Sequence, residues 1–170
     1  VNLGIKFTSG QSGYITGIRF YKGSNNTGTH VGAHWTSGGV QLATATFTGE
    51  TASGWQQVNF SSPVAVTANT VYVASYLAPN GRYASNGSYF ATAGVDNPPL
   101  HALQNGVSGG NGVYRYGSGV AFPTDTYNAA NYWVDVVFTT AAPVDSTPPT
   151  VTATTPANGA TAVALGSVVS

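Results

Sequence analysis

The amino-acid sequence predicts an all-β protein, an antiparallel β-sandwich of the jelly-roll type. Apolar and polar residues alternate with a period of two in several short segments, and Gly, Asn and Pro separate these segments. No segment has the period of an amphipathic helix, and the chain carries only five Lys plus Arg and five Asp plus Glu in 170 residues. About eight short strands at this spacing are typical of sandwiches and jelly rolls.

The first 50 residues contain three predicted strands. The first covers residues 14–21, where Ile18 falls on one face and Ile15 on the other. The next two, 31–36 and 40–48, flank a Ser-Gly-Gly turn and are expected to form a hairpin.

Further strands are predicted at 55–60, 64–66, 71–77 and 132–139. Pro63 marks the start of a strand or an edge strand, because proline cannot donate a hydrogen bond to a neighbour. Most aromatic residues of a sandwich lie in its core. The rings expected there are those of Phe20, Trp35, Trp55, Phe60 and Phe138.

Residues 79–131 form a looser region with Asn-Gly, Gly-Gly and Pro-Pro pairs and short aromatic islands. Loops of this length are usually functional or disordered, and the aromatic content argues against disorder. A pyranose has an apolar C–H face and polar hydroxyls, so its sites combine exposed rings with polar or planar charged side chains. The ligand-binding residues expected on this basis are Arg82, Tyr83, Tyr89, Tyr114, Arg115, Tyr116 and Tyr127. The alternative is that these rings pack inside the protein.

Six segments resemble a known family: GIRFYKG (17–23), NTGTH (26–30), LATATF (42–47), GWQQVNF (54–60), YVASY (72–76) and NYWVDVVF (131–138). Together they are similar to the domain of unknown function numbered 4082, over residues 1–139. Such domains occur in large secreted bacterial proteins, beside immunoglobulin-like repeats and polysaccharide-acting enzymes. The resemblance implies a secreted or cell-surface accessory module whose partners are a polysaccharide or cell-surface glycan and the neighbouring domains of its own chain.

The composition changes near residue 141, which divides the chain into three parts. Residues 1–140 are expected to form the sandwich, and 141–150 a Pro-rich, extended linker. Residues 151–170 contain Pro-Ala-Asn-Gly-Ala, which resembles the first turn of a bacterial immunoglobulin-like domain. Twenty residues cannot bury a core, so this part is predicted to be the truncated start of such a domain.

The chemistry-bearing residues give little support for an enzyme. A glycosidase needs two paired carboxylates, and the five acidic residues share no motif. Asp96 and Asp125 lie in loops rich in oxygen ligands, which suit a structural calcium ion; the alternative is two solvated loop acids. Asp135 and Arg19 are expected to form a cross-strand ion pair. The three His lack the spacing of a zinc site.

The charge balance excludes further classes. The chain has a net charge of zero, and its five Lys plus Arg do not supply the basic patch that a nucleic-acid binder needs. No apolar run reaches the length of a membrane span, so no membrane insertion is expected. Three function classes remain: a non-catalytic carbohydrate-binding module, a structural spacer or adhesin module without a small ligand, and an enzyme. The exposed-ring argument favours the first.

Overall fold

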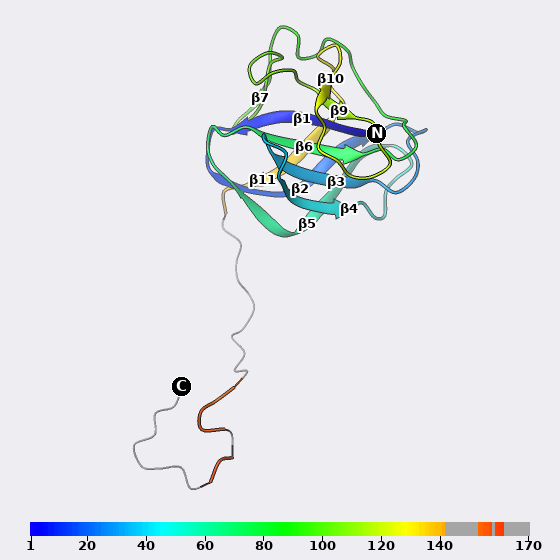
Figure 1. Ribbon diagram of the computed structural model, residues 1–170. Helices are drawn as coiled ribbons and strands as arrows, with labels where there is room; N and C mark the ends of the chain where they lie inside the picture. The colour runs from blue at the N-terminus through cyan, green and yellow to red at the C-terminus, as the bar shows by residue number, and fades with distance from the viewer. Residues whose placement is uncertain (142–152, 158, 162–170) are drawn as a thin grey trace.

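The computed structural model describes residues 1–141, 153–157 and 159–161 and consists of two stacked antiparallel sheets (Figure 1). The predicted all-β antiparallel sandwich is thus confirmed. Of the linker predicted over 141–150 only residue 141 is described, and of the immunoglobulin-like fragment predicted over 151–170 only residues 153–157 and 159–161, so neither prediction is tested. Among the residues that the structure describes, no helix is long and apolar enough to cross a membrane.

The two sheets differ in size. The larger sheet contains β1 (Asn2–Ser9), β3 (Val31–Thr36), β4 (Gln41–Thr46), β6 (Tyr72–Leu77), β7 (Val95–Asn97), β8 (Leu100–Ala102), β9 (Val113–Arg115) and β10 (Asp125–Thr126). The smaller sheet contains β2 (Gly13–Lys22), β5 (Gly54–Val66) and β11 (Val134–Thr139), in the order β11-β2-β5. The strand β11 is therefore an edge of the smaller sheet. The chain passes repeatedly from one sheet to the other, as in a jelly roll.

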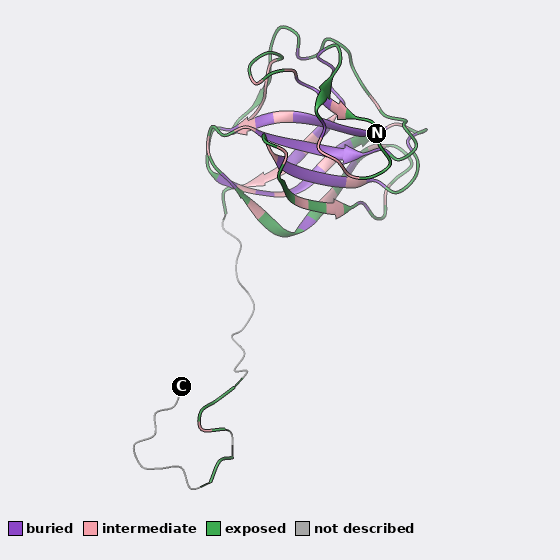
Figure 2. Cartoon of the chain, in the orientation of Figure 1, coloured by how far each residue is buried: buried purple, intermediate pink, exposed green. Residues whose placement is uncertain are grey.

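The core lies between the sheets and follows the period-two pattern (Figure 2). In β1, Leu3 and Phe7 point inward, opposite Ile18 and Phe20 of β2. The larger sheet is also covered on its outer face, where Trp35 packs with Phe122 of a loop. This double cover explains why all six residues of β6 are buried.

Three sequence predictions need correction. The strand β1 was not predicted, although its alternating Leu3, Ile5 and Phe7 carry the strand pattern. The segments 55–60 and 64–66 form one strand, β5, with Pro63 tolerated because β5 is an edge. Ile15 is buried on the core side, because a bulge shifts the register between Ile15 and Gly17.

The looser region predicted over 79–131 is more regular than expected. It supplies the four short strands β7 to β10, which extend the larger sheet on both halves of β1. The strand β8 pairs with the C-terminal half of β1, and β9 pairs with its N-terminal half. The region thereby builds the side of the sandwich that faces β11.

Candidate functional site

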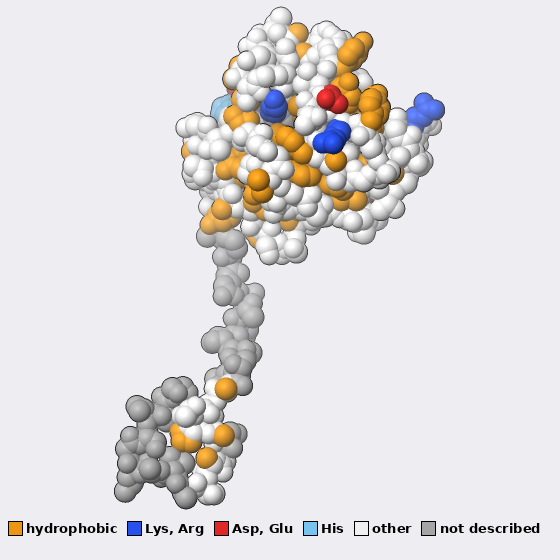
Figure 3. Space-filling model, in the orientation of Figure 1, with side chains coloured by type: hydrophobic (Ala, Val, Ile, Leu, Met, Phe, Trp, Pro, Cys, Tyr) orange, Lys and Arg blue, Asp and Glu red, His pale blue; other side chains and the backbone are white. Residues whose placement is uncertain are grey.

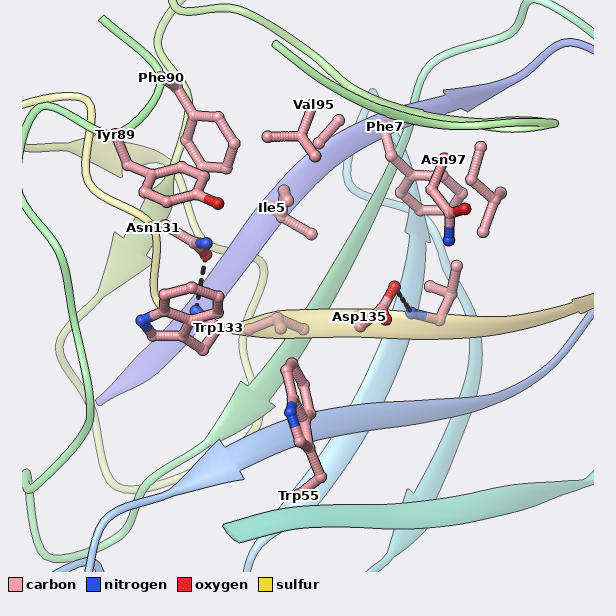
Figure 4. A pocket seen from close by; sticks show the side chains of 14 residues that line it. Ile5, Phe7, Trp55, Tyr89, Phe90, Val95, Asn97, Asn131, Trp133 and Asp135 are labelled. Atoms are coloured by element: carbon pink, nitrogen blue, oxygen red, sulfur yellow. Dashed lines mark hydrogen bonds between the residues drawn. The ribbon is translucent and has the colours of Figure 1, made fainter.

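A groove runs beside the free edge of β11, where the two sheets are not joined by hydrogen bonds (Figure 4). Its volume is about 220 Å³. The walls come from β1, β7, β8 and β11, with β5 and the residues before β11 at the mouth. The lining residues are Ile5, Phe7, Trp55, Tyr89, Phe90, Val95, Asn97, Leu100, Ala102, Asn131, Trp133, Val134, Asp135 and Val136.

Successive side chains of β11 point to opposite faces of the smaller sheet. Val134 and Val136 point toward the core, whereas Asp135 lies on the outer face of the smaller sheet, paired with Arg19. The N–H of Tyr21 donates to the carbonyl of Trp133 (2.9 Å), so the backbone groups of Val134 and Val136 point away from β2. The free edge is therefore presented to the groove.

Trp133 is held in a strained conformation at the entrance to β11. Its φ is 54°, a left-handed value that is rare for a bulky side chain. The side-chain oxygen of Asn131 accepts its backbone N–H (2.7 Å), and the side-chain oxygen of Asn86 accepts its indole N–H (2.7 Å). Such strain persists only where neighbours over-determine it, and it concentrates at functional sites.

Four aromatic side chains form a row, which we call the aromatic row: Tyr21, Trp55, Trp133 and Tyr89. The last three line the groove, and Tyr21 extends the row beyond it through its contact with Trp55. Successive ring centroids are 5.8, 6.4 and 5.5 Å apart. The interplanar angles are 84°, 81° and 65°, so neighbouring rings meet edge to face. The Trp55 side chain is exposed (43%) although the ring is large and apolar. Exposed rings gathered around a groove are typical of a recognition surface.

Arg19 holds the middle of the aromatic row in place. Its guanidinium carbon lies 4.9 Å from the centroid of a Trp55 ring, within the range of a cation–π contact. One of its nitrogens lies 3.7 Å from a carboxylate oxygen of Asp135, which confirms the predicted cross-strand ion pair. Asp135 is the only charged side chain among the lining residues, and Arg19 partly neutralises it.

Residues 1–134 match a protein family described as a domain of unknown function (DUF4082). The chain belongs to the DUF4082 family. The match covers every strand except the remainder of β11, and it confirms the resemblance seen in the sequence over these residues. No curated protein and no solved structure matches the chain.

The predicted ligand residues of this DUF4082 domain separate into groups. Tyr89 lines the groove. Tyr83, Tyr114 and Tyr116 instead gather around the buried Tyr132; the Tyr114 and Tyr116 rings are 5.5 Å apart, and those of Tyr83 and Tyr132 5.7 Å. Burial, with a smaller effect of the neighbouring phenols, raises the pKa of Tyr132 to about 12. We call Tyr83, Tyr114 and Tyr116 the tyrosine cluster.

The other predicted ligand residues lie on the surface of the DUF4082 domain. Arg82, Arg115 and Tyr127 are all exposed and do not line the groove. Arg115 ends β9, on the strand face opposite Tyr114 and Tyr116. The structure thus brings three of the seven predicted residues, Tyr83, Tyr114 and Tyr116, together in one cluster. It places Tyr89 at the groove, and the other three apart from both sites.

Trp55 and Trp133 line the groove but are not among the ligand-binding residues predicted from the sequence. The prediction that Trp55 lies in the core is wrong, because Gln56, Val58 and Phe60 form the inward face of β5. In a strand with a period of two, the inward position of Phe60 places Trp55 on the outward face. The sequence pattern therefore already indicated that Trp55 is exposed. Trp133 is out of phase with the inward residues of β11 in the same way.

The two predicted calcium ligands are far apart. Asp96 lies on β7 beside the C-terminal half of β1, and its carboxylate contacts the His101 ring (2.7 Å). Asp125 pairs with Tyr114 beside the N-terminal half. Five residues of β1 separate these positions, roughly 17 Å. The described residues hold no cluster of three or more metal-ligating side chains. The pair therefore cannot share one ion, and calcium binding at either acid stays a prediction.

Proposed function

We propose that this DUF4082 domain is a non-catalytic carbohydrate-binding module that holds a neutral glycan against the aromatic row. The observation that carries the proposal is the row itself, which places the partly exposed rings of Tyr21, Trp55, Trp133 and Tyr89 beside a groove. Rings supply the apolar surface on which the C–H face of a sugar stacks. Arg19, which contacts Trp55, and its partner Asp135 supply polar groups for hydroxyls beside the rings, and Asn97 supplies an amide elsewhere in the groove lining.

The charge distribution supports a neutral ligand. The chain has zero net charge, and the face drawn in Figure 3 carries few charged side chains. At the groove, the single carboxylate of Asp135 would repel a uronic acid or a sulfated sugar. Following the resemblance noted in the sequence, we propose that the module belongs to a secreted or cell-surface protein, where it targets its chain to a neutral polysaccharide or cell-surface glycan.

The edge of β11 does not favour the addition of a peptide strand. The N–H of Val136, which points into the groove, donates to the carboxylate of its neighbour Asp135 (2.8 Å). An added strand would have to displace this carboxylate in order to pair there. A side chain that caps its own edge in this way is a device against strand addition, and it leaves the groove to a ligand of another kind.

The test compares two exposed rings on different surfaces. Affinity electrophoresis against a panel of polysaccharides is run with the wild-type chain, Trp55→Ala and Tyr116→Ala. Tyr116 is exposed (73%) and belongs to the tyrosine cluster, so it is the matched control. We expect Trp55→Ala to lose retention, since stacking and cation–π contacts of one aromatic ring are worth about 1–2 kcal/mol, roughly tenfold in affinity. Tyr116→Ala should keep it.

Two results contradict the proposal. Loss of retention in Tyr116→Ala alone would move the binding site to the tyrosine cluster. No retention on any glycan would leave a structural spacer or adhesin module, the second class that the sequence supports.

A further inference from the structure

The interior of the groove is chemically different from its mouth. The inner walls are formed by Ile5 and Phe7 of β1, Val134 and Val136 of β11, and Ala102 of β8, all without a polar side-chain atom. Of the polar lining side chains, Asn97 is exposed and Asp135 half-buried. The buried Asn131 uses its side-chain oxygen to accept the backbone N–H of Trp133 (Figure 4). A bound molecule must therefore put an apolar group inside and its hydrogen-bonding groups at the mouth.

An unsubstituted pyranose fits this division poorly. Hydroxyls surround its ring, and a hydroxyl that enters an apolar slot without a partner loses about 1–3 kcal/mol. The Asn131 amide oxygen, which also lines the groove, already accepts the backbone N–H of Trp133. The volume of about 220 Å³ is small as well. Sites that enclose drug-sized ligands measure roughly 300–1,000 Å³. The slot therefore holds one ring-sized group or substituent rather than a length of chain.

We propose that the groove selects N-acetylated sugars, with the acetyl methyl group in the apolar slot between β1 and β11. The amide N–H of the acetamido group donates to the carboxylate of Asp135, and its carbonyl accepts from the side-chain amide of Asn97. The sugar ring itself stacks on Trp55 or Trp133. This inference rests on the proposed function, since it names the substrate class of the same site.

The geometry of the aromatic row adds a second constraint. Because neighbouring rings meet at 65–84°, they cannot all turn a face toward one flat surface. A flat crystalline face would contact one ring at a time. A single flexible chain bends around successive rings, so the site takes soluble oligosaccharides.

The experiment is isothermal titration calorimetry of the full chain with three tetrasaccharides of the same β-1,4 linkage. These are the N-acetylglucosamine oligomer, its deacetylated amine form and the glucose oligomer. We expect the N-acetylated form to bind about tenfold or more tightly than the other two, because one methyl group in a fitted apolar pocket is worth about 10–200-fold. The amine form is the control for simple attraction of a cation to Asp135.

Ala102→Leu fills the slot from β8 and tests its role directly. It should lower affinity for the N-acetylated oligomer about tenfold and leave any weaker binding of the glucose oligomer unchanged. The melting temperature of the variant shows whether it folds, and the wild-type comparison of the three tetrasaccharides does not depend on the variant. Equal affinity for the acetylated and glucose oligomers would overturn selection by the slot while the carbohydrate-binding function stood. Binding of no glycan, here or on the polysaccharide panel, would overturn both.

Discussion

At the scale of single residues, His34 is the least satisfied group of the core. It is fully buried on β3, between the rings of Phe7 and Tyr72, and neither ring nitrogen has a hydrogen-bond partner. Burial lowers the pKa of His34 to about 4. The side chain is therefore neutral in the folded protein at pH 7.

This burial predicts a loss of stability in acid. The unfolded chain takes up a proton on His34 near its ordinary pKa of about 6.5, whereas the folded chain resists protonation down to about pH 4. Stability from this group is complete above pH 6.5 and is lost as the pH falls toward 4, by up to about 3 kcal/mol. Urea unfolding at pH 7 and pH 4.5 should show a smaller decrease in His34→Leu than in the wild type. Parallel pH profiles would refute this account.

At the scale of elements, two loops are joined by a buried ionic cluster at the end of β2. Glu50, in the loop before β5, lies 2.7 Å from the Lys22 ammonium and 2.9 Å from the Nδ1 of His30. The other nitrogen of His30 is 2.8 Å from the side-chain oxygen of Asn26. The cluster fixes the loop that leads into Trp55, and thus one end of the aromatic row.

Removing the charge of Glu50 should be costly. Glu50→Gln leaves Lys22 and His30 buried without their anion, and breaking a buried ion pair costs about 3–5 kcal/mol. Urea unfolding at pH 7 measures the loss. The matched control is Asp96→Asn, whose carboxylate also contacts a His ring but is 75% exposed rather than 11%. Exposed pairs contribute about 0–1 kcal/mol, so equal losses in the two variants would argue against burial as the cause.

At the scale of the whole molecule, the distance between the sheets depends on a glycine. Gly32 of β3 faces the core, and a Cβ atom there would lie 2.9 Å from the Cβ of Ile18 and 3.2 Å from the Phe47 ring. Both neighbours are buried and cannot move aside freely. The two sheets approach closely here because this residue has no side chain.

Gly32→Ala should therefore push the sheets apart. Overpacking of a filled core costs about 1–3 kcal/mol, and thermal unfolding should show the decrease. Gly23→Ala is the control, because a Cβ at Gly23 meets no atom within 4 Å. We expect its stability to stay within about 0.5 kcal/mol of the wild type. If both variants unfold at the wild-type temperature, the sheets have more freedom than the packing indicates.

The sequence by itself determined the fold class, most of the strands and the pairing of Arg19 with Asp135, because these follow from a strict period of two. It did not determine the position of Ile15, since a one-residue bulge reverses the faces and leaves no mark in the pattern. Only the tertiary structure decided that the groove lies at β11, with Tyr89 beside Trp55 and Trp133, apart from the tyrosine cluster. These rings come from three separate segments, and their meeting depends on how the sheet edges pack, which no local pattern encodes.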